Sequence, residues 1–529
     1  MNGAQRLIRT LVDAAVDVCF MNPGTSEMHF VAALDDVPEM RAVLGLFEGV
    51  VTGAADGYGR MAGRPAATLL HLGPGLGNGI ANLHNARRAR TPLVNVVGEH
   101  ATSHLRHDPP LAMDIESLAR PVSSWYRSSS SPDALAADTV DAVTAACGPP
   151  GSVATLVVPA DVSWTEVTDP SSSPTSRGGP KDGRPAGALA TVAVDVVTAV
   201  AKALRSGEPA VVLLGGSATR RAGLLAASRV AGVTGAKLMC ETFPAALERG
   251  AGLPPVERLG YLAEFTQAQL AGARHLILVD AVAPVSFFAY PGIPGYLVPD
   301  GCEVHVLAAP GDDGPGGLEA LADVLGAPTD GFVLQPASRP ERPTGVLTAE
   351  SAGAAIGALL PEGAVVSDEA NTSGIFIPGA TAGAPVHDWL CLTGGAIGQG
   401  MPVATGAAVA CPGRRVLSLE ADGSAMYTLQ ALWTQAREGL DVTTVIFNNG
   451  SYAILEMELG RVGAGSPGPR AHGMLDIARP DLDFAALARG MGVPATRATT
   501  AEEFTVQLER ALGEDGPVLV EAVLARGGW

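Results

Sequence analysis

The sequence predicts an α/β protein with three doubly wound parallel-sheet domains in tandem. Short runs that are apolar on both faces alternate with alanine-rich stretches of helical periodicity, a pattern typical of parallel strands covered by helices. With 529 residues the chain is too long for one hydrophobic core, and ordinary domain sizes give about three domains.

Two segments without helical or strand periodicity divide the chain. Residues 169–187 are rich in Pro, Ser and Gly, and residues 327–344 contain four prolines, as linkers between domains often do. They predict domains over residues 1–168, 188–326 and 345–529.

Each domain is predicted to hold several buried strands. Ligands of such sheets bind outside the carboxyl ends of the strands, so polar residues that directly follow a strand are the first candidates for a site. The expected strands are Val18–Met21, Val43–Phe47, Ala67–Leu72, Leu93–Gly98, Ala154–Val158, Ala210–Leu214, Leu276–Val279, Ala364–Val366, Val416–Leu419, Thr443–Phe447 and Val518–Val523.

The bulk composition excludes several classes of partner. A net charge of −19 argues against nucleic acid and anionic membranes. The start of the chain does not have the pattern of a signal peptide, and no apolar run is long enough for a membrane span, so a cytoplasmic protein is expected. The six cysteines are scattered without a CxxC pair, so neither a disulfide framework nor a zinc site of cysteines is expected.

The segment 416–451 carries polar residues with a specific spacing. Asp422 and Asn449 each follow a predicted strand and are 27 positions apart, so two neighbouring parallel strands would bring their oxygens together. Such ligands suit Mg²⁺ or Ca²⁺, and Gly423 and Ser424 at a helix start offer groups to a phosphate. Taken singly, Asp422 is more often a helix cap and Asn449 part of an Asn-Gly turn. The combination is far more specific.

This segment resembles the cofactor motif of thiamine diphosphate-dependent decarboxylases and acetolactate synthases, in which a Gly-Asp-Gly is followed by Asn-Asn. Ala421 replaces the first glycine, which affects a turn and not a ligand. The resemblance implies thiamine diphosphate and Mg²⁺, with Ca²⁺ as an alternative, and names Asp422, Asn449 and the backbone carbonyl of Ser451 as metal ligands. It also implies that the three domains are pyrimidine-binding, central and diphosphate-binding, in this order.

Two further segments resemble the cofactor site of this family. Asn371 and Thr372 follow the strand Ala364–Val366 and resemble a second diphosphate contact. The run 394–398 resembles the loop that supports the cofactor, where Gly395 lies close to it and Ile397 takes the place of the bulky residue that holds the two rings in a folded shape. The implied cofactor-binding set is Glu48, Asn371, Thr372, Gly395, Ile397, Gly423, Ser424, Asn449 and Ser451.

Glu48 is the predicted catalytic acid. It precedes a helical stretch that contains Asp56-Gly57-Tyr58-Gly59-Arg60, and this spacing resembles that of the family's glutamate at the aminopyrimidine nitrogen. A carboxylate there promotes the tautomer that removes the thiazolium proton, and the cofactor then attacks a 2-oxo acid. The simpler alternative is a carboxylate that favours a helix N-terminus. In this family the glutamate reaches a cofactor on another subunit, so the resemblance implies a homodimer or homotetramer.

Thr25 and His71 resemble the substrate-pocket serine and histidine of benzoylformate decarboxylases. Thr25 lies in the turn after Val18–Met21, and His71 lies within the predicted strand Ala67–Leu72, where a lone histidine is usually structural. The glycine run 73–79 is a weak match to a dinucleotide fingerprint, and the expected acidic partner is missing.

Three departures from these relatives bear on the substrate. Ala289 falls where they have a second histidine, and His100, His104 and His107 form a loop that either compensates or is a solvated surface loop. In the pocket, Ile454 reduces the volume and Glu458 is poorly suited to an aryl group.

We therefore expect decarboxylation of a small or polar 2-oxo acid through an enamine, released as an aldehyde or passed on. The alternative is an acetolactate synthase-like carboligase that transfers the enamine to a second carbonyl compound. The glycine run 215–216 of the central domain is too short to argue for flavin, so no FAD is expected. A non-catalytic relative is disfavoured because Glu48 is present, and a dehydrogenase because the acidic ribose partner is missing.

Overall fold

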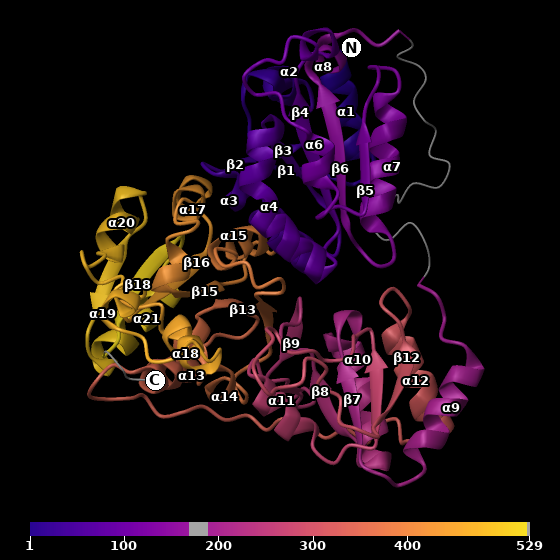
Figure 1. Cartoon of the computed structure of the whole chain (residues 1–529), viewed down its shortest axis with the longest axis vertical. Coiled ribbons are helices and arrows are strands. Elements are labelled where there is room, and N and C mark those ends of the chain that lie inside the picture. Colours follow the sequence, from indigo (N-terminus) through magenta and orange to yellow (C-terminus); the bar gives the residue numbers. More distant parts are fainter. Residues whose placement is uncertain (169–188, 526–529) are drawn as a thin grey trace.

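The computed structural model describes residues 1–168 and 189–525, which form three α/β units (Figure 1). The first unit has a six-stranded parallel sheet in the order β2-β1-β3-β4-β6-β5. Its strands are β1 (Val18–Asn22), β2 (Arg41–Leu44), β3 (Ala66–Leu70), β4 (Leu93–Glu99), β5 (Trp125–Ser128) and β6 (Val153–Pro159). Its helices are α1 (Gly3–Asp13), α2 (Met28–Ala33), α3 (Glu48–Ala62), α4 (Leu72–Ala89), α5 (Thr102–Leu105), α6 (Ile115–Ala119), α7 (Leu135–Cys147) and α8 (Ala160–Trp164).

The central unit has a five-stranded parallel sheet in the order β10-β8-β7-β11-β12. Its strands are β7 (Ala210–Leu214), β8 (Lys237–Cys240), β10 (Glu257–Arg258), β11 (His275–Val279) and β12 (Glu303–Ala308). Its helices are α9 (Val194–Leu204), α10 (Arg221–Thr234), α11 (Ala263–Leu270) and α12 (Gly314–Leu325).

The third unit has a seven-stranded sheet in the order β17-β18-β16-β15-β13-β14-β9. Its own strands are parallel: β13 (Val365–Glu369), β14 (His387–Cys391), β15 (Val416–Ala421), β16 (Val442–Asn448), β17 (Ala495–Ala498) and β18 (Val518–Val523). The edge strand β9 (Leu247–Arg249) comes from the central part of the chain and pairs antiparallel with β14. The helices are α13 (Ala349–Leu359), α14 (Ile377–Ala380), α15 (Gly400–Ala410), α16 (Asp422–Ala425), α17 (Ala431–Glu438), α18 (Ala453–Arg461), α19 (Pro469–His472), α20 (Phe484–Gly490) and α21 (Ala501–Gly513).

The predicted fold class is confirmed, and two predicted strands need correction. The strand expected over Val43–Phe47 ends at Leu44, because the chain then turns away from β1 to enter α3. The strand expected to contain His71 ends at Leu70, so that His71 is the residue that directly precedes α4. The predicted linker 169–187 lies outside the described residues, and residues 327–344 contain neither helix nor strand.

The first and third units pack together through α3 and α15, which approach very closely. A Cβ atom at Gly57 would lie 2.1 Å from the carbonyl oxygen of Val403, and one at Gly406 would lie 1.8 Å from that of Ala54. Only glycine fits at such contacts. The glycines that follow Glu48 in the sequence therefore allow two helices from different units to touch.

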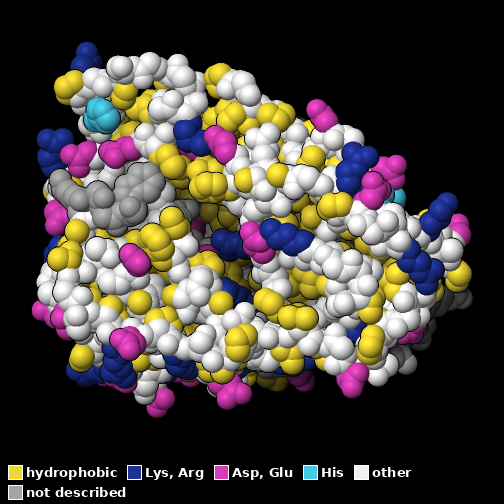
Figure 2. All heavy atoms as spheres, turned by 90° about the horizontal axis from the view of Figure 1, so that it is seen from below, with side chains coloured by type: hydrophobic (Ala, Val, Ile, Leu, Met, Phe, Trp, Pro, Cys, Tyr) yellow, Lys and Arg dark blue, Asp and Glu magenta, His cyan; other side chains and the backbone are white. Residues whose placement is uncertain are grey.

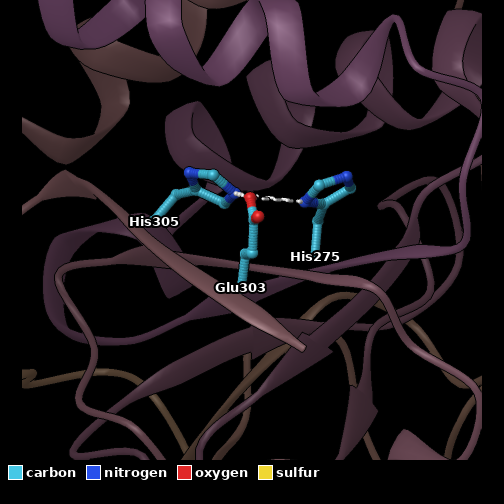
Figure 3. A group of neighbouring side chains, drawn as sticks. All are labelled: His275, Glu303 and His305. Atoms are coloured by element: carbon cyan, nitrogen blue, oxygen red, sulfur yellow. Dashed lines mark hydrogen bonds and ion pairs between the residues drawn. The ribbon is translucent and has the colours of Figure 1, made fainter. Parts of the chain in front are cut away.

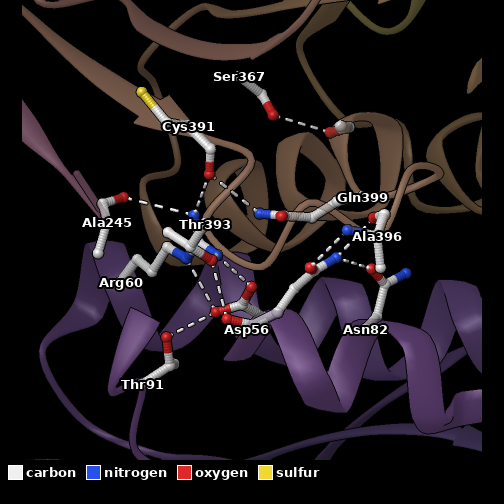
Figure 4. Close-up of polar contacts among 12 residues, drawn as sticks. Asp56, Arg60, Asn82, Thr91, Ala245, Ser367, Cys391, Thr393, Ala396 and Gln399 are labelled. Carbon is white, nitrogen blue, oxygen red and sulfur yellow. Dashed lines mark hydrogen bonds and ion pairs between the residues drawn. The ribbon is translucent and has the colours of Figure 1, made fainter. Parts of the chain in front are cut away.

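A buried ion pair fixes the same contact (Figure 4). Arg60 donates to both oxygens of Asp56, at 2.9 and 2.5 Å, and Thr91 Oγ1 also donates to Asp56 at 2.6 Å. Arg60 then reaches the third unit, where it donates to the carbonyl of Cys391 at 2.8 Å and to Thr393 Oγ1 at 2.9 Å. The segment that follows β14 is thus held against the first unit.

The surface is mixed in character. On the face shown in Figure 2, basic and acidic side chains are interspersed with hydrophobic ones. Among the described residues, no helix is long and apolar enough to cross a membrane.

Candidate active site

Asp422 is the centre of a polar group at the carboxyl ends of β15 and β16. Its Oδ1 accepts from the N–H of Gly423 at 2.8 Å, and its Oδ2 accepts from the N–H groups of Asn449 at 3.0 Å and Gly450 at 2.7 Å. Burial raises the pKa of the carboxyl, while these backbone donors act in the opposite direction. The amide oxygen of Asn449 accepts from the N–H of Ser451 at 2.9 Å. The prediction that neighbouring strands bring Asp422, Asn449 and Ser451 together agrees with this geometry.

A third strand, β13, adds Asn371 and Thr372 to this group. Asn371 has a left-handed backbone with φ of 49°, and its Nδ2 donates to Ser424 Oγ at 2.8 Å. Thr372, Asn449 and Ser451 line a cleft of about 420 Å³. The predicted diphosphate residues of β13 and β15 therefore lie beside the predicted metal ligands.

The donor set fits a hydrated magnesium ion and a diphosphate. A carboxylate, an amide oxygen and a backbone carbonyl are the oxygen ligands that Mg²⁺ takes, usually together with substrate phosphates. At the start of α16, Ser424 belongs to the same polar group, since its Oγ accepts from Asn371 Nδ2 at 2.8 Å, and a hydroxyl at a helix start suits a phosphate. Gly423 is required there, because a Cβ atom would lie 2.4 Å from the ring of Tyr452.

The glycine loop that contains Gly395 and Ile397 is held by a buried carboxylate. Glu369, at the end of β13, accepts from the N–H groups of Gly398 at 2.7 Å and Gly400 at 2.6 Å. It lies opposite Glu420 of β15 in the sheet register. Burial raises the pKa of Glu369 to about 7, and burial together with Glu369 raises that of Glu420. The pair therefore favours one proton between two carboxyls, which lets Glu369 accept both loop hydrogen bonds.

Glu48 is the first residue of α3 and lies at the carboxyl edge of the first sheet. Only 7% of the residue is exposed, and its Oε2 accepts from Asn78 Nδ2 of α4 at 3.0 Å. Its Oε1 receives no hydrogen bond from the described residues. Gly75 gives this oxygen room, since a Cβ atom there would lie 3.3 Å from Oε1 and 3.5 Å from Cβ of His71. Glu48 and His71 are thus neighbours on one side of α4.

His71 forms a dyad with Glu27, a residue that the sequence had placed only in the turn after β1. His71 Nδ1 lies 2.7 Å from Glu27 Oε2, which also accepts from the N–H of Gly24 at 2.8 Å. Glu27 is buried, which raises its pKa, and its Oε1 has no partner. Thr25 is exposed in the same turn. The structure therefore groups His71 and Glu27 near Glu48, and Thr25 lies in the turn that carries Glu27.

The loop that carries His100, His104 and His107 begins beside this dyad and then runs along the surface. A Cβ atom at Gly98 would clash with Glu27 Oε1, and Glu99 accepts from the N–H of His100 at 2.7 Å. His100 Nε2 is buried without a partner. His104 and His107 continue outward as exposed rings, with centroids 5.8 Å apart. Only His100 of the three is therefore close to the candidate site.

The central unit contributes an aromatic wall. A Cβ atom at Gly395 would lie 2.4 Å from the ring of Phe287, and this ring packs against Tyr261 at a centroid distance of 5.3 Å. Ala289 lies exposed in the same segment as Phe287. The segment that carries Ala289 in place of a histidine thus reaches the loop of Gly395.

The two predicted pocket residues of α18 lie one turn apart. Glu458 is nine-tenths buried, with its Oε2 3.6 Å from Nε of Arg461. Burial raises the pKa values of Tyr290 and Tyr261, and the carboxylate of Glu458 raises both further. Ile454 is partly buried on the same face. Glu458 therefore contributes negative charge beside the aromatic wall.

A carboxylate binds the loop that contains the glycine run 215–216 of the central unit. Asp280 Oδ2 accepts from the N–H of Ser217 at 2.8 Å and from its hydroxyl at 3.0 Å. A Cβ atom at Gly216 would lie 2.1 Å from the same oxygen. The carboxylate of Asp280, which also pairs with Arg90 at 2.7 Å, therefore fills the space inside this loop.

Two matches to protein families cover the two ends of the chain. Residues 1–118 match the thiamine pyrophosphate enzyme, N-terminal TPP binding domain, and residues 383–522 match the thiamine pyrophosphate enzyme, C-terminal TPP binding domain. The first match includes Glu48 and His71, and the second includes Asp422.

Similar whole proteins are known from several bacteria. The chain is 60% identical over 525 residues to IlvX of Mycobacterium tuberculosis, a provisionally assigned acetolactate synthase large subunit, with 99% of each chain covered. It is 32% identical to the benzoylformate decarboxylase of Pseudomonas aeruginosa over 95% of each chain. The solved structure of the thiamine diphosphate-dependent 4-hydroxybenzoylformate decarboxylase of Rhodococcus jostii RHA1 superposes with a TM-score of 0.85 at 25% identity, with full coverage of both chains.

These similarities extend over all three units, and the matched ends hold the two groups of polar residues described above. The chain therefore belongs to the family of thiamine diphosphate-dependent enzymes that includes benzoylformate decarboxylases and acetolactate synthases.

Proposed function

We propose that the protein decarboxylates a small or polar 2-oxo acid, with Glu48, His71 and Thr25 as its reacting groups. The observation that carries this proposal is the grouping of Glu48 with the His71–Glu27 dyad at one sheet edge, in a chain whose third unit offers a diphosphate and metal site. When bound, thiamine diphosphate supplies a carbon nucleophile and an electron sink for the loss of carbon dioxide.

Each residue has a proposed task that follows from its surroundings. The Oε1 of Glu48 would hydrogen-bond to the ring nitrogen of the aminopyrimidine and share a proton with it, while Asn78 holds Oε2. The dyad carboxylate of Glu27 would fix the ring of His71, so that Nε2 faces the substrate and exchanges a proton with it. Thr25 would orient the substrate carboxylate by its hydroxyl.

The third unit is proposed to anchor the cofactor. Asp422, Asn449 and the carbonyl of Ser451 would hold Mg²⁺, and Asn371, Thr372, Gly423 and Ser424 would contact the diphosphate. Gly395 and Ile397 would support the cofactor rings. Among the described residues of one chain, no hydrogen bond joins Glu48 to the group around Asp422. We therefore propose that the two groups meet across a homodimer, alone or within a homotetramer.

The pocket residues support a small or polar substrate. Ile454 reduces the volume, and Glu458 places a carboxylate where an aryl group would need an apolar surface. No flavin is proposed, because the glycine run 215–216 is short and the carboxylate of Asp280 fills its loop.

A carboligase is the second candidate. It is favoured by Ala289, which removes the side-chain acid that would help to protonate and release an aldehyde, and by the 60% identity to a protein named as an acetolactate synthase subunit. In that case the carbon nucleophile that remains after loss of carbon dioxide would react with a second carbonyl compound before it is protonated.

One experiment tests both candidates. The protein with thiamine diphosphate and Mg²⁺ is given pyruvate, 2-oxobutyrate and benzoylformate, and carbon dioxide, aldehyde and hydroxyketone products are measured. We expect release of carbon dioxide from the aliphatic acids, and we expect the Glu48→Gln variant to release it about 10²–10⁴-fold more slowly. A free aldehyde supports the decarboxylase, and acetolactate or acetoin from pyruvate supports the carboligase. Faster turnover of benzoylformate than of pyruvate would contradict the substrate proposal. If no acid releases carbon dioxide, and the Glu48→Gln variant behaves as the parent does, the proposed activity is contradicted.

A further inference from the structure

A group of side chains with metal-ligand chemistry lies in the central unit, outside the candidate active site (Figure 3). His275 is the first residue of β11, and Glu303 is the first residue of the neighbouring edge strand β12. His305 lies two positions further along β12. These residues therefore lie at the amino ends of their strands, whereas the candidate active-site residues follow carboxyl ends.

The ligand atoms are spaced as a single small cation requires. His275 Nδ1 and His305 Nε2 are 3.1 Å apart, and Glu303 Oε2 lies 3.8 Å from the first and 3.7 Å from the second. In a tetrahedral zinc site with bonds of about 2.0–2.1 Å, two ligand atoms lie about 3.4 Å apart. The three separations bracket this value, and Glu303, with 73% of its side chain exposed, is free to adjust.

A further carboxylate fixes the orientation of the more buried imidazole. Glu208, in the turn between α9 and β7, has its Oε2 3.2 Å from His275 Nε2, and only 8% of the His275 side chain is exposed. A proton on Nε2, donated to Glu208, leaves the lone pair of Nδ1 directed at His305 and Glu303. This is the carboxylate–histidine–metal arrangement found around protein-bound zinc.

We propose that His275, His305 and Glu303 bind one divalent cation of the zinc type, with Glu208 as the positioning residue for His275. Two imidazoles and one carboxylate suit Zn²⁺ or Co²⁺, whereas Mg²⁺ prefers oxygen ligands throughout. Water would complete the coordination on the exposed side. The cation would join the edge strand β12, the start of β11 and the α9–β7 turn, so its role is structural.

The probe is Co²⁺, added to the protein already loaded with thiamine diphosphate and excess Mg²⁺ so that the Asp422 site is filled. We expect one equivalent of Co²⁺ per chain with the visible absorption of a four-coordinate ion. His305→Gln should weaken binding at least 10-fold, and Glu208→Gln should weaken it by about 10–100-fold, as outer-shell partners do. Zn²⁺ should raise the Tm of the parent and of the control variant His29→Gln, but not that of His305→Gln.

The competing explanation is a simple hydrogen bond between two imidazoles, which requires no cation. It predicts no Co²⁺ spectrum at micromolar concentration, or the same Co²⁺ binding by parent and His305→Gln, and either result overturns the proposal. If His305→Gln does not fold, Glu303→Gln takes its place, because this exposed side chain contributes little to folding. Unchanged Co²⁺ affinity in that variant would likewise overturn the proposal.

Discussion

The ion pair between Asp56 and Arg60 connects the helix of Glu48 to the third unit, and its removal should destabilise the whole contact. Neither side chain has more than 1% of its surface exposed. Asp56→Ala would leave the guanidinium of Arg60 buried without a counter-charge, and Thr91 would lose its acceptor. Because Arg60 also donates to the segment 391–393, the loop of Gly395 that follows should be held less firmly.

The size of the effect follows from the burial. Removal of one partner from a buried pair costs about 3–5 kcal/mol, because the remaining charge is desolvated. In domains of this size about 1 kcal/mol corresponds to roughly 2–4 °C, so the Tm of the transition that includes the first unit should fall by roughly 6–20 °C. The double variant Asp56→Leu/Arg60→Met removes both charges and should lose less than Asp56→Ala alone.

Differential scanning calorimetry, together with titration of thiamine diphosphate by fluorescence, measures both consequences. The matched control is Glu116→Ala, which breaks an ion pair of the same i,i+4 spacing with Arg120 at the surface, where the partners are 48% and 64% exposed. Such exposed pairs contribute about 0–1 kcal/mol. A Tm change for Asp56→Ala no larger than that of the control, with unchanged cofactor affinity, would refute the reasoning.

Three other predictions concern single carboxyl groups. Glu48→Gln should lower kcat by about 10²–10⁴-fold while the cofactor still binds, as calorimetric titration would show. Glu27→Gln should lower kcat while the cofactor still binds, because the ring of His71 loses the carboxylate that fixes it; an unchanged kcat would show that the dyad has no part in turnover. Burial raises the pKa of Glu241 from 4.5 to about 7. Ionisation then opposes folding, so the parent should lose Tm as pH rises through this window, and Glu241→Gln should lose less, the remaining loss coming from carboxyls such as Glu369.

The sequence predicted best those residues that directly follow a strand. Asp422 and Asn449 stand beside each other because β15 and β16 are adjacent and parallel, which their apolar runs and short spacing already indicated. The same argument placed Glu48 and Asn371 at sheet edges. These positions depend on local periodicity and on one rule of topology, and both are visible in a single sequence.

Residues whose position depends on side-chain packing or on strand register could not be predicted in this way. Glu27 reaches His71 only because Gly24 leaves room for the ring of His71 and Gly98 leaves room for the carboxylate of Glu27. Glu369 reaches the loop of Gly398 only through the register of β13 with β15. The sequence shows no periodic or spacing signal for either contact. The edge strand β9 was likewise missed, since three residues from the central part of the chain are too few for a strand pattern.

The contrast between these two groups of residues explains why the cofactor is better determined than the product. The chemistry proposed up to the loss of carbon dioxide uses a carboxylate at Glu48 and oxygen ligands at Asp422 and Asn449. These residues lie directly after a strand or, for Glu48, after the short turn that follows β2. The later choice between protonation and capture by a second carbonyl compound depends on groups contributed by turns and by other units, namely the dyad of His71 and the segment around Ala289. Such groups change without altering any strand, so relatives with one fold and one cofactor can form different products. The product analysis of Glu27→Gln and of an Ala289→His variant tests this directly: if the aldehyde fraction does not rise in Ala289→His, protonation is controlled elsewhere.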